Sequence, residues 1–336
     1  MQVFDQTIHD LVEKALEGNG LTPRETCALY AVPPTSKEAA LIRWAGQELS
    51  MRATGGIAEI HAQIGLNAST CGKNCLFCSF ARVNDVRKGV YEIPVEDVLE
   101  YAKMYVEEGA NLILMLTTAS YRFEKLVDMV HAVREVIPAD LPLLVNTGDM
   151  SLDQAKTLKT AGAQGAYHAV RMREGEDTTI PVDVRMQTLA NMRDAGLSLS
   201  TCVEPVGPEH TPEEITEATF RCIESGAKTS GVGRRISVPG TKLFGRGMLN
   251  DVETAKLVAV YRLAVGLDYQ LNCSAGTVMM ASAGANLAWA EVGTNPRDTV
   301  ARTEHGGRGS NVAQLRRMFA GAGWTVREGP SPGWFD

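Results

Sequence analysis

Short apolar runs alternate with amphipathic segments along most of the chain, from about residue 57 onward. Apolar positions recur at helical spacing in the amphipathic segments, which predicts helices, while the short runs between them predict buried strands. The predicted strands are 57–66, 112–116, 141–145, 165–170, 197–203, 231–238, 269–273 and 286–290. The predicted helices are 95–108, 123–136, 152–161, 182–195, 212–225 and 252–265.

Strands that alternate with helices are typical of a parallel sheet with helical crossovers. About eight such units fit within this length, which predicts the α/β class and a closed (β/α)8 TIM-type barrel. The alternative is an open, doubly wound sheet. The count of apolar runs favours the barrel.

The regions before and after these units have a different pattern. Residues 1–50 show helical spacing, and the prolines of 33–36 interrupt it before a second helix that begins near Lys37. Residues 324–336 are rich in glycine and proline. We therefore expect an N-terminal helical extension at 1–50, a barrel domain at 51–323 and a C-terminal tail at 324–336 that lies on the barrel surface.

Composition restricts the partners and the compartment. Of the 336 residues, 44% are hydrophobic and 22% charged, as in a globular protein with a large core. The net charge of −7 and the lack of a basic run give no indication of a nucleic-acid partner. The sequence shows no signal peptide and no apolar stretch of membrane-spanning length. Seven cysteines, an odd number, indicate a reducing compartment, so we expect a cytoplasmic protein with no membrane or nucleic-acid partner.

Three cysteines carry the most specific chemical signal. Cys71, Cys75 and Cys78 have the spacing Cys-x3-Cys-x2-Cys, and Phe77 precedes the last of them. Soft thiolate sulfur selects zinc, copper(I) or iron–sulfur. A structural zinc site usually has four ligands in two separated pairs, and no fourth cysteine follows nearby. Three thiolates on a cube of four irons leave one iron open, which we favour over a zinc loop or a chance grouping.

This segment resembles the radical S-adenosylmethionine (SAM) superfamily. The resemblance implies that the cysteines hold a [4Fe-4S] cluster whose open iron binds S-adenosyl-L-methionine. It also implies that an electron from the cluster cleaves the sulfonium to methionine and a 5′-deoxyadenosyl radical. The cysteines follow the first predicted strand, which places them at the C-terminal mouth of a barrel.

Within the superfamily the chain resembles the biotin synthase-like branch. That branch includes biotin synthase, an [FeFe]-hydrogenase maturase and methylornithine synthase, and proteins that help to build the [Fe]-hydrogenase cofactor are a further relative. The similarity extends over roughly residues 55–320 and is most specific at the cysteines.

The resemblance implies contacts to SAM after the first three strands. Phe77 packs beside the adenine. Thr117, Thr118 and Ala119 stand where the superfamily has a Gly-Gly-Glu-like turn that holds the SAM amino group. Asn146, at the end of the third strand, binds SAM or substrate. Each of these is also an ordinary residue type for a turn or a helix cap.

Three further residues are assigned from the same branch. Arg185 resembles an arginine that pairs with the SAM carboxylate, a role that suits a planar guanidinium. Arg171 stands near the place of a ribose-binding acidic residue, with Glu174 or Glu176 as substitutes. Glu204 falls in the segment that supports the adenine, and a buried glutamate is costly unless paired. An internal salt bridge to Arg185 or Arg171 is the alternative for Glu204.

Biotin synthase also needs a second, sulfur-donating cluster. At the places of its ligands this chain has Met115, Leu144, Ser200 and Asn272. We therefore expect no second cluster. Cys202 and Cys273 lie on predicted strands and are alternative ligands of an unconventional auxiliary centre, although buried cysteines more often act as small hydrophobic residues.

The expected function is that of a single-cluster radical SAM enzyme. Its radical abstracts hydrogen from a small polar substrate in cofactor or metabolite biosynthesis, and rearrangement, cleavage or cyclisation follows. The expected partners are a small-molecule substrate and a one-electron donor such as flavodoxin or ferredoxin. No residue is singled out as catalytic. The alternatives are a sulfur-inserting synthase of the lipoyl or biotin type and, in another class, a non-catalytic metal-binding scaffold.

Overall fold

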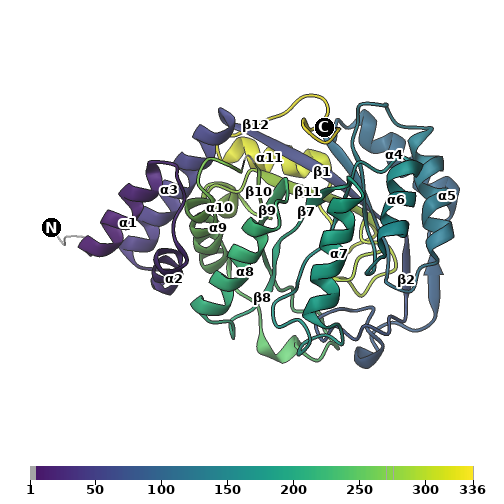
Figure 1. The fold of residues 1–336 in the computed structure, drawn as a ribbon, viewed down its shortest axis with the longest axis horizontal. Coiled ribbons are helices and arrows are strands. Elements are labelled where there is room, and N and C mark those ends of the chain that lie inside the picture. The colour runs from purple at the N-terminus through teal and green to yellow at the C-terminus, as the bar shows by residue number, and fades with distance from the viewer. Residues whose placement is uncertain (1–4, 270, 275, 336) are drawn as a thin grey trace.

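The computed structural model describes residues 5–335 except 270 and 275, and its centre is a closed barrel (Figure 1). The ring of parallel strands runs β1-β4-β5-β6-β7-β9-β10-β11 and returns to β1. These strands are β1 (Ile57–Gly65), β4 (Leu112–Leu116), β5 (Leu143–Asn146), β6 (Gly165–Tyr167), β7 (Ser198–Ser200), β9 (Thr229–Arg234), β10 (Leu271–Cys273) and β11 (Leu287–Gly293). Because β10 pairs with β9 on one side and β11 on the other, the open sheet is excluded and the predicted barrel is confirmed.

The six predicted helices all form, and no end differs from its predicted position by more than two residues. They are α4 (Val95–Glu107), α5 (Phe123–Arg134), α6 (Leu152–Ala161), α7 (Val182–Asp194), α8 (Pro212–Glu224) and α9 (Asp251–Val265). Side chains fix several starts. Thr211 accepts a hydrogen bond from the Glu214 backbone and Asn250 from that of Glu253, and each glutamate bonds back to the cap, so both helices begin with a capping box.

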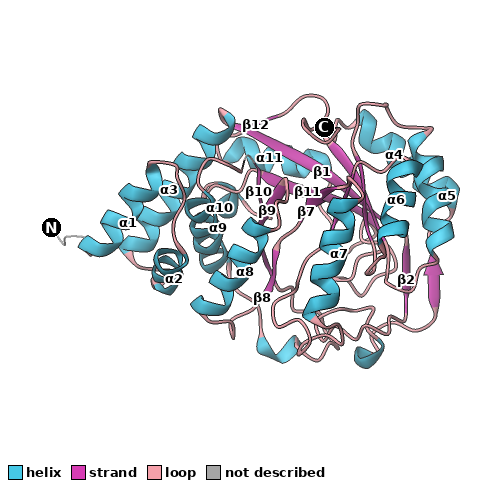
Figure 2. Ribbon diagram, viewed as in Figure 1, coloured by secondary structure: helices cyan, strands magenta, loops and turns pink. Residues whose placement is uncertain are grey.

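The N-terminal region forms three helices that stand together beside α8 and α9 (Figure 2). They are α1 (Gln6–Leu16), α2 (Pro23–Ala31) and α3 (Lys37–Thr54). Ser36 caps α3 by accepting a hydrogen bond from the Ala39 backbone at 3.1 Å, which confirms the predicted start near Lys37. Helix α3 continues beyond residue 50 and packs closely on α9: a Cβ atom on Gly46 would lie 2.7 Å from Cα of Ala259. Residues 1–4, also predicted to belong to this extension, lie outside the described part of the chain.

Smaller elements complete the chain. β7 is followed by β8 (Val203–Val206), which pairs with β9 in continuation of the same barrel wall. The other short elements are β2 (Asn67–Ser69), β3 (Val90–Glu92), η1 (Arg82–Asn84), η2 (Phe244–Arg246), α10 (Val278–Ala281), α11 (Val312–Gly321) and β12 (Thr325–Val326). No helix of residues 5–335, as far as they are described, combines the length and the apolar character needed to cross a membrane.

Most side chains of the C-terminal tail are exposed or half-buried on the barrel surface, but Trp334 enters the barrel. After β12 pairs with β1, Trp334 reaches the interior and is 2% exposed among Leu112, Leu114 and Leu144. Space for the indole exists because β6 begins with a glycine: a Cβ atom on Gly165 would lie 3.1 Å from the Trp334 ring. Leu112 and Gly165 are the first residues of their strands, so Trp334 closes the N-terminal end of the barrel.

Candidate cofactor site at the barrel mouth

A cavity of about 450 Å³ lies at the C-terminal ends of the barrel strands. Every residue that was predicted to bind metal or cofactor lines it: Cys71, Cys75, Phe77, Cys78, Thr117, Thr118, Ala119, Asn146, Arg171, Arg185 and Glu204. Residues far apart in sequence therefore meet in one place, where barrel enzymes carry their chemistry.

The loop that carries the three cysteines is held by hydrogen bonds to its own backbone. The Cys71 amide donates to the Phe80 carbonyl at 2.8 Å. The Asn84 side-chain nitrogen donates to the carbonyls of Cys75 at 3.2 Å and Cys78 at 2.8 Å. Asn84 is 8% exposed, so these bonds are shielded from water. These contacts join the cysteine loop to the segment around Asn84.

The three thiols fit an iron–sulfur cluster better than a zinc ion. All three are free, and burial raises the pKa of Cys75 to about 11 and of Cys78 to about 12, so binding a metal releases protons. Their sulfur atoms do not all lie within 4.8 Å of one another. Zinc–sulfur bonds of about 2.3 Å in a tetrahedron place the ligands only about 3.8 Å apart. Wider spacing suits ligands that bind separate irons of one cluster.

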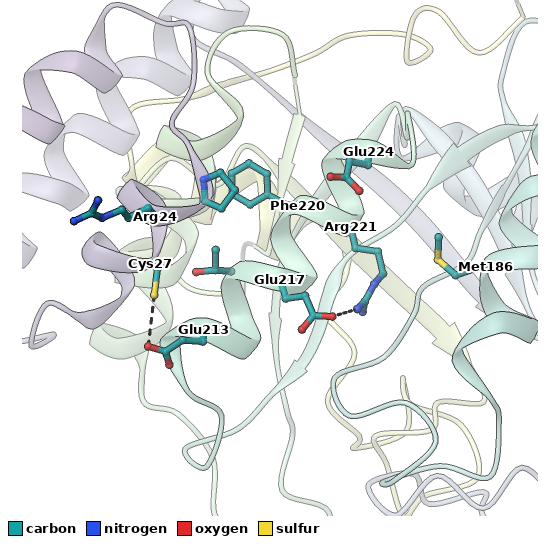
Figure 3. Close-up of a pocket in the computed structure, with 10 residues that line it drawn as sticks. Arg24, Cys27, Met186, Glu213, Glu217, Phe220, Arg221 and Glu224 are labelled. Atoms are coloured by element: carbon teal, nitrogen blue, oxygen red, sulfur yellow. Dashed lines mark hydrogen bonds and ion pairs between the residues drawn. The ribbon is translucent and has the colours of Figure 1, made fainter.

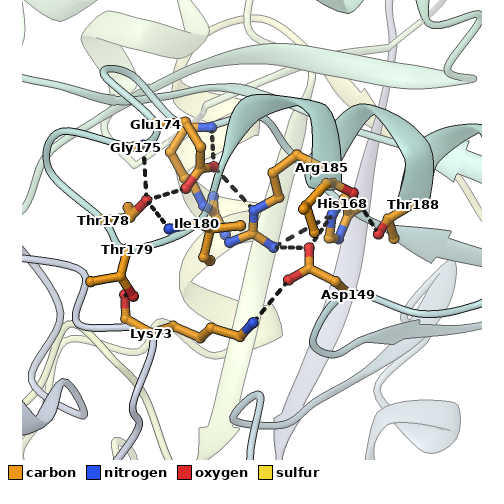
Figure 4. Close-up of polar contacts among 12 residues, drawn as sticks. Lys73, Asp149, His168, Glu174, Gly175, Thr178, Thr179, Ile180, Arg185 and Thr188 are labelled. Atoms are coloured by element: carbon orange, nitrogen blue, oxygen red, sulfur yellow. Dashed lines mark hydrogen bonds and ion pairs between the residues drawn. The ribbon is translucent and has the colours of Figure 1, made fainter.

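Arg185 on α7 is fixed in place by two carboxylates (Figure 4). Its Nη1 donates to Asp149 Oδ1 at 3.0 Å and its Nε donates to Glu174 Oε2 at 3.1 Å. Lys73 of the cysteine loop lies 3.4 Å from the other oxygen of Asp149. Burial would raise the Asp149 pKa, but the hydrogen bond with His168 and the charge of Arg185 outweigh it and lower that pKa. The Nη2 group of Arg185 makes no hydrogen bond within the described residues, and the side chain lines the cavity.

Glu204 has its ion-pair partner in Arg171, one of the two alternatives that the sequence left open. The Tyr167 hydroxyl also donates to this carboxylate, and the Arg171 guanidinium lies 5.8 Å from the centre of the Tyr167 ring. All three side chains line the cavity. Glu174 and Glu176, the two proposed substitutes for a ribose-binding acid, do not line it: Glu174 is committed to Arg185, and Glu176 is exposed.

Some of the residues after β4 and β5 already make hydrogen bonds within the protein, whereas Asn146 does not use its side chain in this way. The Thr118 amide donates to Asn67 Oδ1 at 2.9 Å, and its hydroxyl is 2.9 Å from that of Ser69. The Thr117 hydroxyl donates to that of Thr147 at 2.8 Å. The Asn146 side chain makes no hydrogen bond within the described residues. Among these positions, Asn146 has the amide that is free to bind a ligand.

The sequence places four residues where biotin synthase has the ligands of its second cluster. Two of them, Met115 and Asn272, face away from the cavity. Met115 packs in the core between the strands and the outer helices, while its neighbours Leu114 and Leu116 line the cavity. The Asn272 side chain donates to the Val258 carbonyl of α9 at 3.1 Å, so it too faces the outer layer. The interpretation of Met115 and Asn272 as interior residues is therefore wrong. Successive strand residues alternate between faces, and the neighbours Leu114, Leu116 and Cys273 line the cavity instead.

The other positions of that comparison are occupied by contacts within the barrel wall. Leu144 belongs to the inner hydrophobic cluster with Trp334, and the Ser200 hydroxyl accepts a hydrogen bond from Thr229 at 2.7 Å. Cys202 and Cys273 both line the cavity. Burial raises the pKa of Cys273 to about 11, and Cys202 donates to the Gly231 carbonyl at 3.3 Å.

Several polar residues of the cavity were not predicted. His168 follows β6, Glu291 and Trp289 lie on β11, and Arg297 comes from the loop after β11. Arg297 forms an ion pair with Glu291. The sequence carries one signal that could have found the residues of β11. Along 287–293, large or polar side chains alternate with small ones. This alternation is typical of a strand whose two faces have different surroundings.

A second hollow, of about 620 Å³, lies on the outer surface between α2 and α8 (Figure 3). It carries a single cysteine, Cys27, whose thiol lies 3.7 Å from Glu213. Figure 3 shows Arg221 paired with Glu217 beside it. This lining has no set of metal ligands, so the barrel cavity is the candidate site.

A family model described as the radical SAM superfamily matches residues 68–222. The matched range contains the cysteine loop and all the predicted SAM contacts. This part of the chain is thus a radical SAM domain. Members of this family use a [4Fe-4S] cluster and S-adenosylmethionine, take electrons from reductants and act on small molecules. The predictions of a radical SAM enzyme and of its two cofactors are thus confirmed at the level of the family.

Curated relatives and solved structures agree with this family. Biotin synthase of Chlorobaculum parvum is 25% identical over 329 residues, which cover 90% of this chain and 97% of that protein. Biotin synthase of Rhodopirellula baltica is 25% identical over 276 residues, 79% of this chain and 75% of that protein. The structure of methylornithine synthase (PylB) matches with a TM-score of 0.79 at 17% identity and covers 95% of this chain and 97% of that one. The [FeFe]-hydrogenase maturase HydG matches with a TM-score of 0.77 at 16% identity, over 97% and 77%. At these identities the solved structures show a shared fold.

Proposed function

We propose that this radical SAM enzyme uses a single cluster to act on a small polar substrate in cofactor or metabolite biosynthesis. The observation that carries the proposal is one cavity lined by three free cysteines and by the arginines and small residues suited to SAM. When bound, the cluster and SAM supply a 5′-deoxyadenosyl radical that removes a hydrogen atom from the substrate. The residues of this chain position the reactants and exclude water.

Each side of the cavity has a distinct task in this proposal. Cys71, Cys75 and Cys78 hold three irons, and Phe77 packs beside the adenine. The free Nη2 side of Arg185 pairs with the SAM carboxylate. The contacts of Arg185 to two carboxylates orient its guanidinium before the ligand arrives, which reduces the entropy lost on binding.

The backbone at Thr117, Thr118 and Ala119 approaches the SAM amino group, and the amide of Asn146 faces SAM or substrate. Arg171 and Glu204 neutralise each other, so they offer ribose hydroxyls both a donor and an acceptor without adding net charge. The opposite wall, with Glu291 and Arg297, accommodates a polar substrate. Electrons come from a one-electron carrier such as flavodoxin or ferredoxin.

The test is SAM cleavage by anaerobically reconstituted protein with dithionite. We expect a brown protein whose reduced EPR spectrum changes with SAM and which forms 5′-deoxyadenosine. Replacement of Cys71, Cys75 and Cys78 together by alanine should abolish all three signals, because no other described residues offer three thiols to one cavity. Cys27→Ala, on the outer surface, serves as the control and should retain them. A protein that binds iron but never cleaves SAM would be a metal-binding scaffold.

A second candidate function is sulfur insertion. It is favoured by one observation, that Cys202 and Cys273 line the same cavity as the cysteine loop. Iron analysis and anomalous scattering distinguish the two candidates. Four irons per chain, all at the cysteine loop, support the single-cluster proposal, whereas additional iron beside Cys202 or Cys273 would make sulfur insertion the better one.

A further inference from the structure

We propose that the surface beside the cysteine loop binds a small acidic protein that delivers single electrons. This docking face consists of residues 82–88, around η1, and residues 242–248, around η2. The inference rests on the proposed function, because it assigns the place where the reductant of the cluster binds. The two short helical turns lie among the loops at the lower edge of Figure 1, one blue and one green.

The two halves of the docking face meet at Asn84. The Lys242 amide donates to Asn84 Oδ1 at 2.9 Å, and the Leu243 amide donates to the Leu76 carbonyl at 3.3 Å. The Asn84 side chain also donates to the carbonyls of Cys75 and Cys78. One buried side chain therefore joins both halves of this surface to two of the predicted cluster ligands. A protein that binds here therefore contacts segments that are hydrogen-bonded to the cysteine loop.

The docking face has an apolar centre. Val83 is 39% exposed, Phe244 47% and Met248 37%, although all three are large hydrophobic residues. Val83 and Phe244 are the sequence neighbours of Asn84 and Leu243, so both stand next to the contact that joins the two halves. Exposed apolar side chains with a polar rim are typical of surfaces that bind other proteins.

The rim is positively charged in an acidic chain. Residues 82–88 carry three cations and one anion, and residues 242–248 carry two cations and no anion, which gives a joint charge of +4. The remaining residues must then carry −11, because the whole chain carries −7. Arg246 is shared with Asp177 and Glu209, and Lys88 lies 3.6 Å from Asp85 at exposed positions, whereas Arg82 and Lys242 have no carboxylate partner within the described residues.

These charges select the partner. A protein with an acidic surface is attracted to this face and repelled by the rest of the molecule, which orients it as it approaches. A second copy of the chain is a weaker fit, since it would bring one positive face against another. The reaction needs a brief contact only: the donor loses one electron, the cluster gains one, and no bond forms between the proteins. Transient contacts of this kind are small.

The test compares two routes of electron delivery in the double variant Lys88→Glu/Lys242→Glu. The probe is a flavodoxin with an acidic surface, and the readout is the rate of 5′-deoxyadenosine formation against its concentration. We expect KM for flavodoxin to rise roughly tenfold at low salt, as for a lost steering charge. The difference should shrink as salt is raised, because the Debye length falls to about 8 Å at 0.15 M. Cleavage driven by dithionite should be unchanged.

Matched controls lie on the outer helices. Lys103→Glu/Lys156→Glu changes the same charge at exposed positions of α4 and α6 and should leave KM for flavodoxin as in the wild type. Phe244→Ala should also raise that KM, with little dependence on salt, while Phe335→Ala, 51% exposed at the other end of the barrel, should not.

Binding of oxidised flavodoxin, measured by calorimetric titration, separates this inference from the proposed function because it needs no SAM cleavage. Weaker binding by the double variant supports the docking face even if the reaction itself is something else. Equal binding and equal KM in variant and wild type would overturn it. So would a change of oligomeric state in Phe244→Ala without any effect on flavodoxin, since the face would then join two copies of this chain.

Discussion

Arg185 is the residue whose role depends most on its surroundings. The sequence indicates an arginine suited to a carboxylate, and the structure adds that Asp149 and Glu174 already hold it. Those partners come from other loops, so sequence spacing could not reveal them. The same holds for the pairing of Arg171 with Glu204, which the sequence narrowed to two alternatives. Residue types and strand ends were predictable, whereas contacts between loops required the folded chain.

Replacing Arg185 should weaken SAM binding and also reduce stability. Loss of a hydrogen bond between charged groups costs about 1.5–3 kcal/mol, so Arg185→Ala should bind SAM roughly ten- to a hundredfold more weakly. It should also unfold at a lower temperature, because two carboxylates lose a buried partner. Arg185→Lys should recover only part of the affinity. Equilibrium SAM titration and iron analysis of reconstituted protein measure the effect.

Arg193→Ala is the matched control for this experiment, because Arg193 lies on the same helix with its side chain 63% exposed. It should retain the affinity and the stability of the wild type. SAM binding by Arg185→Ala that equals the wild type would remove Arg185 from the proposed site, and Arg171 would be examined next.

His168 should make stability depend on pH. Burial lowers its pKa below the ordinary value, and nearby Arg185 adds to this against the opposing effect of Asp149. The unfolded chain therefore binds a proton more readily than the folded one below about pH 6.5, and the free energy of unfolding falls as the pH decreases from 7.5 to 5.5. His168→Gln should flatten this dependence in urea unfolding of the cluster-free protein. His131→Gln, exposed on α5, should keep the wild-type slope, and an equal slope in both variants would contradict the assignment to His168.

At the scale of elements, the pattern of apolar runs predicted every barrel strand and six helices. It did not fix which face each side chain takes. Met115 and Asn272 were placed inside the barrel and face outward, since an error of one residue in a strand exchanges its two faces. Short elements such as η1 and β12 have too few residues to show a period, so they were not predicted.

The cysteine loop should depend on Asn84. Asn84→Ala removes two hydrogen bonds to the carbonyls of the loop and one from the η2 side, each worth about 1 kcal/mol. We expect the variant to fold, bind iron and then lose it to a chelator faster than the wild type. Asn191→Ala, which removes the hydrogen bond from α7 to the Met150 carbonyl and the one from Gln187, should change stability without changing iron release. Equal release rates in all three proteins would show that the loop keeps its shape without Asn84.

At the scale of the whole molecule, the fold class and the approximate extents of the parts were accessible from the sequence. The position of Trp334 could not be predicted, because a tail rich in glycine and proline has no apolar period that would indicate which side chain is buried. Trp334 packs against interior leucines and donates a hydrogen bond to Ser331 at 2.9 Å. Nothing in the periodicity of 324–336 distinguishes it from the exposed Phe335 next to it.

These two neighbours give a direct comparison of buried and exposed aromatic residues. Trp334→Ala should reduce the free energy of unfolding by about 3–5 kcal/mol, as for other large-to-small changes in a core. Phe335→Ala should change it by less than about 0.5 kcal/mol, because that side chain is 51% exposed. Chemical denaturation of both variants measures the difference. Similar, small effects in both would mean that the tail does not close the barrel in solution.

Trp334 follows every barrel strand in the sequence, and this sets an order of events during synthesis. All eight strands and the cysteine loop leave the ribosome before the residue that closes their N-terminal ends. A ring of strands that formed before then would be open to water at both ends, and Leu112, Leu114 and Leu144 would lack the indole that covers them. Once the tail is in place, Trp334 closes the N-terminal end of the barrel. From that moment, molecules enter and leave by the mouth, past the cysteines.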